Sequence, residues 1–418
     1  MSSRVLVALL LLSGFLPACD DECTTCPAPA GGIQGRVIDL MGNPVGGIRI
    51  VIGEQMTTTG PHGAFHFDDV LVPYDLVVLD SPVLVYRGLR RSDPAVMVHR
   101  VAAPLRFAIV TGRVPFDPAV STTLFFAGAL GNPVSASPQT SSYWMNLLWT
   151  GELAPHPGTL YALRQTEMQT RSKEYLGLAT RPVTLDEGAR VVEDFEVTDF
   201  VEVPTANVHA TVTLPGAYES VWHGLTLTFE GQKLNMEHSQ VEAGLEFDFT
   251  APVLRNGSCR IAVGARDASL FGYSQGATEF LPGLDSSVEI VVFAGPELSS
   301  PTDGATDVAQ STPFAWNAGD GPGIYVMSVS STTSATTLLV FTSETSTILT
   351  DVFGLVLEPE ALYRWRVWKE NELPHVDDAG PVNRWTGTGP TSWLAAPRQD
   401  GAFAYSQEFT FTTAVMTP

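Results

Sequence analysis

Apolar and polar residues alternate with a period of two along much of the chain. The alternation is clearest at Ile48, Ile50 and Ile52, at Leu225, Leu227 and Phe229, and at Tyr325, Met327 and Val329. A period of two places successive side chains on opposite faces of a β-strand. The 30 prolines and 37 glycines are spread between these runs, where they favour turns. The sequence therefore predicts an all-β fold of tandem antiparallel β-sandwiches, with a helix only in the apolar run near the N-terminus.

That N-terminal run is Val5–Leu16, and it follows Arg4. It is too short to span a bilayer as a helix, but it has the length of an export signal core. The run leads into Leu16-Pro17-Ala18-Cys19. This ending resembles the lipobox of bacterial lipoproteins, in which the cysteine becomes the mature N-terminus and carries acyl chains such as palmitate. Pro17 departs from the usual pattern.

The resemblance implies a signal peptide over residues 1–18, lipidation of Cys19, and a Pro/Gly-rich tether over residues 19–32. The lipid would be the only membrane attachment, because no later stretch reaches the roughly 18 apolar residues of a membrane helix. Several acyl chains suffice for stable anchoring. Asp20 resembles the inner-membrane retention residue of enteric lipoproteins, a rule that does not hold in all bacteria. The predicted location is the bacterial cell envelope, on the outer or inner membrane, periplasmic or surface-exposed.

Residues 31–102 carry an ordered series of short motifs. The series is Ile33–Ile38, the turn Gly42-Asn43-Pro44, Thr57-Thr58-Thr59, the pair Phe65 and Phe67, and Tyr74–Val78. This order resembles the carboxypeptidase regulatory-like, or transthyretin-like, domain. The resemblance implies a seven-stranded sandwich that serves as a non-catalytic accessory module, in a class sometimes grouped with carbohydrate-binding folds.

Residues 103–200 and 201–294 continue the strand pattern and share an outline. Val110–Val114 in the first segment corresponds to Val208–Val212 in the second. Each segment also ends with an Asp-containing turn before an apolar strand. The period is close to 100 residues, the size of one β-sandwich. We therefore expect two similar β-domains, in a chain of 418 residues that is too long for one hydrophobic core.

The last segment, residues 295–418, places aromatic residues on an early and on a late predicted strand. Trp316 lies on the early strand, and Tyr363 and Trp365 lie on the late one. This order resembles a fibronectin type III domain of the immunoglobulin-like class. The departure is a long connection over residues 369–403, and long connections of this kind are often functional. The complete prediction is four β-sandwiches in a row.

The charge of the chain is strongly acidic, with 23 Lys and Arg, 45 Asp and Glu, and a net charge of −22. Such a surface repels phosphate backbones, so nucleic acid is not expected as a partner. A solvated acidic surface without a specific partner is the simplest interpretation.

The four cysteines are Cys19, Cys23, Cys26 and Cys259. Cys23 and Cys26 form a CxxC pair, which in other settings is a redox pair or half of a zinc site. Here it lies in the tether, without a second CxxC, so a local disulfide or two unreacted thiols is favoured. Cys259 is expected as a small buried hydrophobic residue.

Ser274 lies in Gly272-Tyr273-Ser274-Gln275-Gly276, which matches the G-x-S-x-G string of a nucleophile elbow. The elbow requires a helix directly after the serine, and Pro282 with Gly283 interrupts one. An esterase-like hydrolase that uses Ser274, with Asp285 and His375 nominally available, is therefore only a remote alternative.

Metal sites are not predicted, and neither is a cofactor. The chain has no H-E-x-x-H motif, and His62 and His66 are expected to point apart across a turn. Four loop aspartates could bind calcium but lack the rhythm of a calcium loop, so solvated turns are favoured. They are Asp303, Asp307, Asp377 and Asp378.

Trp385 and Trp393 lie in the long connection and form the candidate ligand-binding loop. Aromatic residues on a sandwich loop offer contact area with a polar tip for sugars or peptides. The alternative is that they fold back over a sheet edge as core. The predicted function is a non-enzymatic, lipid-anchored structural or interaction module. A carbohydrate- or peptidoglycan-binding accessory lipoprotein is the second hypothesis.

Overall fold

The structure is a computed structural model, and it describes most of the chain from residue 31 onward. The described ranges are 31–39, 42–98, 103–128, 134–136, 141–150, 155–166, 174–216, 218–230, 232–239, 245–267, 273–332, 337–350, 357–379 and 402–414. The predicted signal peptide, Cys19, the tether up to residue 30, and most of the long connection with Trp385 and Trp393 lie outside them.

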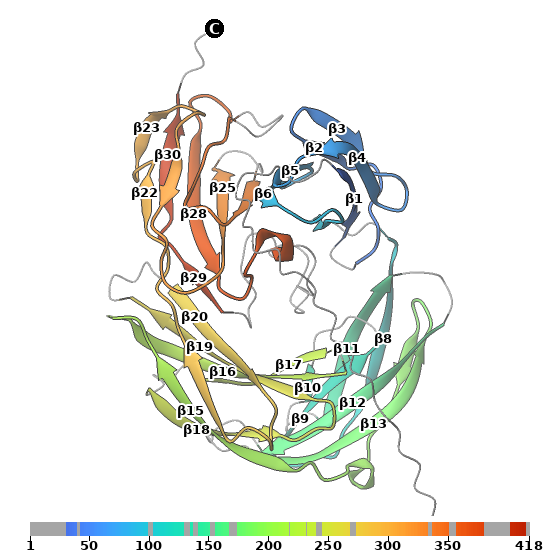
Figure 1. Ribbon diagram of the computed structural model, residues 1–418. Coiled ribbons are helices and arrows are strands. Elements are labelled where there is room, and N and C mark those ends of the chain that lie inside the picture. The colour runs from blue at the N-terminus through green and yellow to red at the C-terminus, as the bar shows by residue number, and fades with distance from the viewer. Residues whose placement is uncertain are drawn as a thin grey trace, which may run out of the picture.

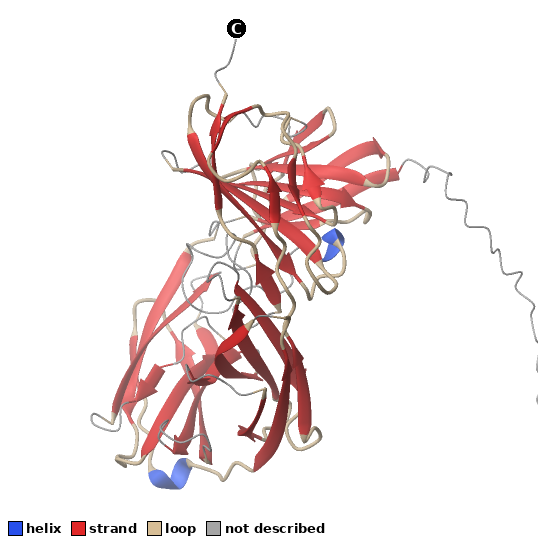
Figure 2. Ribbon diagram, turned by 90° about the vertical axis from the view of Figure 1, so that its left-hand side faces the viewer, coloured by secondary structure: helices blue, strands red, loops and turns tan. Residues whose placement is uncertain are grey.

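The regular elements of these ranges are β-strands, apart from two short 3-10 helices (Figure 2). No helix in the described ranges is long and apolar enough to cross a bilayer. The all-β prediction of tandem sandwiches is confirmed. The strands group into four lobes, which follow one another along the chain (Figure 1).

The first lobe contains seven strands in two facing sheets. They are β1 (Gly31–Ile38), β2 (Arg49–Ile52), β3 (Gln55–Thr58), β4 (Ala64–Val70), β5 (Tyr74–Leu79), β6 (Val83–Leu89) and β7 (Ala95–Met97). One sheet has the order β4-β1-β7, and the strands of the other run β3-β2-β5-β6. In β1, Ile33 and Val37 face the core, while Gln34 and Arg36 alternate with them and face outward.

The second lobe also contains seven strands, followed by the 3-10 helix η1 (Val197–Asp199). The strands are β8 (Leu105–Arg113), β9 (Val120–Ala127), β10 (Val134–Ala136), β11 (Ser142–Thr150), β12 (His156–Thr166), β13 (Tyr175–Leu185) and β14 (Arg190–Val192). Its sheets are β11-β8-β14 and β10-β9-β12-β13. The core between them includes Val110, Phe126 and Met145.

The third lobe repeats the same number of strands. They are β15 (Thr205–Thr213), β16 (Glu219–Phe229), β17 (Gln232–Ser239), β18 (Glu246–Pro252), β19 (Ser258–Arg266), β20 (Tyr273–Phe280) and β21 (Ser287–Val291). One sheet is β18-β15-β21, and the other strands run β17-β16-β19-β20.

The first three lobes share one topology. In each, the first strand is the centre of a three-stranded sheet, with the fourth strand antiparallel and the seventh strand parallel to it. The other strands follow the order third, second, fifth, sixth. The sequence pattern predicted a similarity between the second and third lobes alone. The strand order shows that the first lobe has the same topology as both.

The fourth lobe has a different strand order. Its strands are β22 (Leu298–Ser300), β23 (Ala305–Val308), β24 (Phe314–Trp316), β25 (Ile324–Ser331), β26 (Thr337–Thr342), β27 (Ser346–Thr347), β28 (Leu362–Glu370), β29 (Phe403–Tyr405) and β30 (Phe409–Thr413), with the 3-10 helix η2 at Val376–Ala379. Trp316, Tyr363 and Trp365 lie in its core, as the sequence predicted.

The lobes do not form a simple row. Strand β6 of the first lobe pairs in parallel with β26 of the fourth, and β20 of the third lobe pairs with β29 of the fourth. Three lobes thereby contribute to one 14-stranded sheet. Both β6 and β20 are the sixth strand of their lobe, and each would otherwise leave unpaired backbone groups at a sheet edge. In Figure 1 the first and fourth lobes lie side by side above the second and third.

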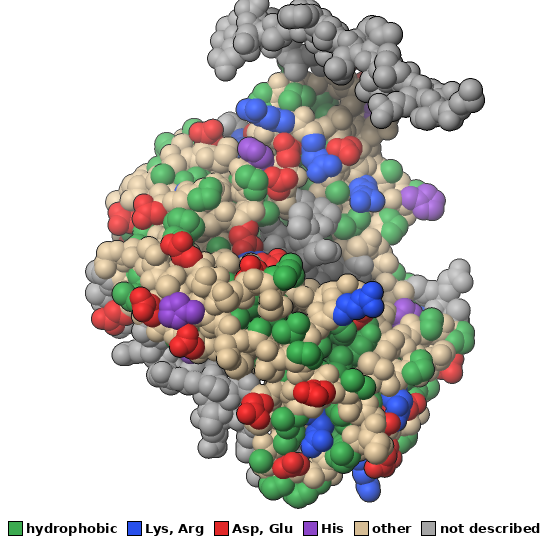
Figure 3. Space-filling view, turned by 60° about the horizontal axis from the view of Figure 1, so that its bottom comes forward, with side chains coloured by type: hydrophobic (Ala, Val, Ile, Leu, Met, Phe, Trp, Pro, Cys, Tyr) green, Lys and Arg blue, Asp and Glu red, His purple; other side chains and the backbone are tan. Residues whose placement is uncertain are grey.

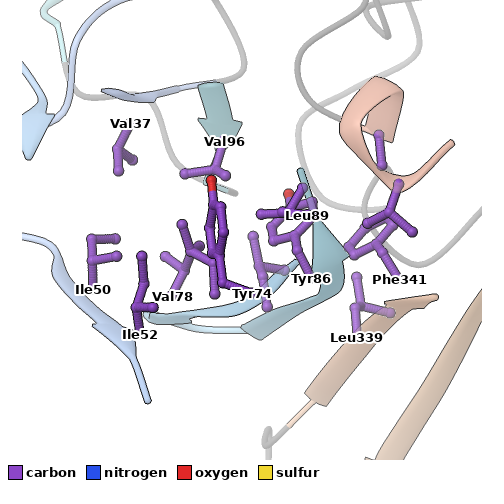
Figure 4. Packing of buried hydrophobic residues seen from close by; sticks show 14 of the residues in the cluster. Val37, Ile50, Ile52, Tyr74, Val78, Tyr86, Leu89, Val96, Leu339 and Phe341 are labelled. Carbon is purple, nitrogen blue, oxygen red and sulfur yellow. The ribbon is translucent and has the colours of Figure 1, made fainter. Parts of the chain in front are cut away.

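The β6–β26 junction is apolar on both faces of the sheet. On β26, Leu338 and Val340 belong to the core of the fourth lobe, whereas Leu339 and Phe341 belong to the core of the first. The ring of Phe341 stacks on that of Tyr86, with centroids 4.7 Å apart and an interplanar angle of 6°. Figure 4 shows this shared core extending from the first lobe to β26. A strand buried on both faces has a continuous apolar run rather than an alternation.

The second lobe contacts its neighbours through side chains. Phe125 and Tyr161 stack on each other and meet the edge of Phe229 from the third lobe. Thr150 donates a hydrogen bond of 3.1 Å to the side-chain oxygen of Asn43 in the first lobe. Between the third and fourth lobes, Arg260 forms an ion pair with Glu372.

Candidate functional site

Ser274 does not form a nucleophile elbow. It lies within β20, fully buried, and pairs with Ala265 on one side and Ala404 on the other. Its hydroxyl group has no hydrogen-bond partner among the described residues. A continuous strand cannot present a serine at a sharp turn beside an oxyanion hole. The esterase alternative is therefore wrong on geometric grounds.

Lys369 lies on the same sheet row as Ser274, because Ala404 pairs with both residues. Its ammonium group donates hydrogen bonds to the carbonyl oxygens of Ala318 (3.2 Å) and Gly321 (2.5 Å), and it lies over the ring of Tyr325. Burial lowers the pKa of Lys369. The ammonium group thus fixes the loop before β25 and does not face an open site.

The histidines and aspartates that the sequence raised as possible metal ligands do not gather. No group of three His, Cys, Asp or Glu side chains in the described ranges could hold a metal ion. Asp303 instead accepts hydrogen bonds from the backbone N–H and the hydroxyl group of Thr410 (2.8 and 3.0 Å), which lower the pKa of Asp303. Asp377 accepts bonds from the backbone N–H groups of Arg90 and Arg91.

Cys259 is fully buried on β19, as the sequence predicted. Burial raises the pKa of its thiol to about 12. A thiol that stays protonated is a weak nucleophile and a poor metal ligand, so Cys259 acts as core.

The outer face of the sheet β11-β8-β14 exposes large apolar side chains, and we call it the β8–β11 face. Its exposed members are Leu105 (45% exposed), Phe107 (50%), Trp144 (60%), Leu148 (37%) and Val192 (64%). They lie on adjacent strands, because Leu148 pairs with Phe107 and Val192 pairs with Thr111. Single exposed apolar residues are ordinary, but contiguous ones mark interaction sites.

Two features fix the position of this face. Strands β8 and β11 pair through nine consecutive residue pairs without a bulge, so alternate side chains stand on one regular surface. From the opposite side of β11, Tyr143 donates a hydrogen bond of 2.5 Å to the carbonyl oxygen of Glu193. Burial raises the pKa of Tyr143, so its hydroxyl group stays a donor.

Polar groups accompany the apolar side chains. Asn146 lies between Trp144 and Leu148 on the outward row of β11 and is exposed. Arg190 donates through Nε to the hydroxyl group of Thr111 over 3.3 Å. The face thus combines stacking area with hydrogen-bonding groups, which suits a partner that is itself partly polar.

The residue pattern predicted the strands of this face but not the face itself. Residues 143–149 are apolar at every position except Asn146. A strand that is apolar on both faces either is buried on both sides or exposes an apolar face. The apolar run was therefore visible in the sequence. Whether its outer face is buried or exposed depends on what packs against the sheet, which the sequence does not show.

No family model and no curated protein matches the chain. Among solved structures, the TIE protein of Bacillus anthracis is similar at 10% identity and a TM-score of 0.17, over 63% of this chain and 50% of that one. The chain thus spans half the length of that protein. A Ca²⁺-stabilized adhesin of an Antarctic bacterium, described as binding ice, is similar at 10% identity and a TM-score of 0.15, over 93% and 99% of the two chains.

A DUF3823 family protein from Parabacteroides merdae is similar at 12% identity and a TM-score of 0.13, over 38% of this chain and 92% of that one. Similarities this low carry no argument about function. The functional interpretation therefore rests on the residues of this chain.

Proposed function

We propose that the protein is a non-enzymatic interaction module of the bacterial cell envelope, held at a membrane by acyl chains on Cys19. The observation that carries the proposal is the β8–β11 face, with five large apolar side chains exposed on one sheet. The same sheet position in the first and third lobes presents Arg36 and His209 instead. An apolar surface that is not required by the fold is suited to binding.

The domain organisation is part of the proposal. The proposed domains are residues 31–102, 103–200, 201–294 and 295–418, and the grouping of the strands into four lobes supports them. The first is proposed as a carboxypeptidase regulatory-like sandwich, which its seven strands in two sheets support. The last is proposed as a fibronectin type III-like domain, which the burial of Trp316, Tyr363 and Trp365 supports.

The binding part of the proposal is tested with intact cells and purified envelope material. The full-length chain and its Trp144→Ala variant are compared for retention on envelope glycan and envelope protein fractions. Phe116→Ala is the matched control, because Phe116 is 63% exposed but lies outside the face. We expect Trp144→Ala alone to reduce retention at least tenfold. Equal retention of all three proteins would contradict the proposal.

The fraction that retains the chain separates the two function classes. The exposed indole of Trp144 beside Asn146 favours a glycan partner, because an aromatic ring stacks on a sugar while an amide bonds its hydroxyl groups. Retention on protein alone would instead support a structural scaffold. Trp385→Ala with Trp393→Ala tests the predicted loop in the same assay.

The anchor is tested by metabolic labelling with palmitate. We expect the wild-type chain and Cys23→Ser to carry the label and enter the membrane fraction. Cys19→Ser should do neither. Label on Cys19→Ser, or a mature N-terminus beyond Cys19 in mass spectrometry, would remove the lipid anchor from the proposal.

A further inference from the structure

The first lobe contains a hollow of about 620 Å³ on the outer face of the sheet β4-β1-β7, and we call it the Arg36 groove. Its floor is formed by Gln34 and Arg36 of β1 and by His66 of β4. Thr57 and Thr58 of β3 line one side, and Arg91 and Asp93 line another. This volume lies within the range of small-molecule sites.

Arg36 lies at the centre of this hollow. Its neighbours on the two adjacent strands are Ala64 and Ala95. Two alanines leave open space beside the long side chain, which is why the sheet is hollowed here. On the inner face, Gly35 leaves room for the Phe65 ring, whose nearest atom would lie 2.1 Å from an added Cβ.

The guanidinium group of Arg36 is available to a ligand. It makes no side-chain hydrogen bond or ion pair with any residue that the structure describes. Asp93 lies within electrostatic range, but its carboxylate is hydrogen-bonded to Nε of Arg91 at 2.9 Å.

The charges around Arg36 favour a single negative charge on the ligand. A guanidinium group binds one carboxylate through two parallel hydrogen bonds. The carboxylate of Asp93 lines the same hollow and would repel a second negative charge. A monocarboxylate therefore fits better than a phosphate dianion.

The remaining lining groups favour hydroxyl groups on the ligand. The amide of Gln34 and the hydroxyl groups of Thr57 and Thr58 are neutral donors and acceptors. Apolar contact is limited, because Ala64 and Ala95 are small. These groups match a compact polyhydroxyl molecule rather than an apolar one.

The wall of the groove is fixed by residues outside it. The hydroxyl group of Tyr74 donates to the carbonyl oxygen of Arg91 over 2.7 Å. The backbone N–H groups of Arg90 and Arg91 donate to Oδ1 of Asp377, in η2 of the fourth lobe, over 2.9 and 3.1 Å. The site is thus preformed, which lowers the entropic cost of binding.

We propose that the Arg36 groove binds a sugar acid, a monocarboxylate that carries several hydroxyl groups, with its carboxylate on Arg36. The proposal goes beyond the β8–β11 face and does not depend on it. The two surfaces lie on different lobes, so they can be tested separately.

The test is isothermal titration of the full-length chain with D-glucuronate. D-glucose, inorganic phosphate and an N-acetylated aspartyl peptide amide are the comparison ligands. We expect glucuronate to bind, and glucose and phosphate to bind at least tenfold more weakly. Tighter binding of the peptide would overturn the assignment to sugar acids, and equal binding of glucose would overturn the role of the carboxylate.

Substitutions test whether glucuronate binds in the Arg36 groove. Arg36→Ala should lower glucuronate affinity at least tenfold, with an unchanged circular dichroism spectrum. Arg255→Ala is the matched control, an exposed arginine in the turn between β18 and β19. Trp144→Ala should leave glucuronate affinity unchanged. Unaltered binding by Arg36→Ala would refute the site, whatever the result for the β8–β11 face.

Discussion

Arg36, Ile109 and His209 occupy one position in three copies of the same sheet. Each lies on the central strand and pairs with the first residue of the parallel seventh strand. The partners on the two flanking strands are Ala64 and Ala95 for Arg36, Asn146 and Arg190 for Ile109, and Asp248 and Ser287 for His209.

The three surfaces differ in kind although their backbones share one topology. The first lobe has a hollow lined by Arg36, the second has an apolar face, and the third has a His209–Asp248 pair at 2.8 Å. The inward residues of all three sheets are apolar, because they hold the sandwich together. The outward residues do not fill the core, so a binding surface can form there without disturbing the sandwich.

The lobes also differ at the edge formed by the sixth strand. Strand β6 pairs with β26, and β20 pairs with β29. Within the described ranges, the outer edge of β13 in the second lobe forms a single bridge, between Leu178 and Val201. The edge strands of the first and third lobes therefore gain backbone partners from the fourth. Acidic side chains are scattered over the face of the molecule that Figure 3 shows.

The largest expected effect comes from breaking the β6–β26 junction. Phe341→Ala removes the ring stacked on Tyr86 and should lower the free energy of unfolding by about 3–5 kcal/mol. Hydrogen exchange should show faster exchange of β6 amides and unchanged exchange of β13 amides. Phe116→Ala is the exposed control. Equal loss of protection in both strands would show that the lobes unfold as one unit.

The next largest expected effect is a difference in stability between alanine variants of two adjacent leucines of β11. Leu147 is fully buried, whereas Leu148 points to the β8–β11 face. Leu147→Ala should cost about 2–5 kcal/mol in denaturant unfolding, because it leaves a cavity. Leu148→Ala should cost well under half of that, and it should weaken retention on envelope material. A reversed order of the two stabilities would contradict the assignment of the faces.

A smaller effect tests the link between the fourth lobe and the Arg36 groove. Asp377→Asn weakens the acceptor of two backbone N–H groups and should cost about 1 kcal/mol. Glucuronate affinity should fall, because the wall at Arg91 loosens. Asp378→Asn, at the neighbouring position, is the control. Identical affinities of the two variants would show that the wall does not need Asp377.

The smallest effect concerns pH and the Arg91–Asp93 pair. The hydrogen bond from Arg91 lowers the pKa of Asp93 below its ordinary value. A depressed carboxyl pKa contributes stability that is present above the ordinary value of about 3.9 and is lost as the pH falls through the folded-state value. Carbon NMR titration should find the Asp93 pKa depressed in the wild type and restored toward its ordinary value in Arg91→Ala. An unchanged value in the variant would mean that Arg91 is not the cause.

Much of the fold was predictable because strand periodicity is a local property. Alternation predicted β1, β2 and β25, and the aromatic positions predicted the core of Trp316 and Trp365. The G-x-S-x-G motif wrongly suggested a nucleophile elbow at Ser274, because a short motif does not specify whether the backbone turns there. Ser274 needed the pairing of β20 with β29 to show that it is buried.

The sequence by itself determined the all-β class, the placement of inward residues and the burial of Cys259, because each follows from the chemistry of neighbouring positions along one strand. It also contained the apolar residues 143–149, without showing that their outer face stays uncovered. Only the tertiary structure decided which edges join, since β6 and β26 are separated by about 250 residues and backbone pairing has no sequence signature. The same long-range folding brought Asp377 to the loop at Arg91 and placed Arg36 between two alanines on the adjacent strands.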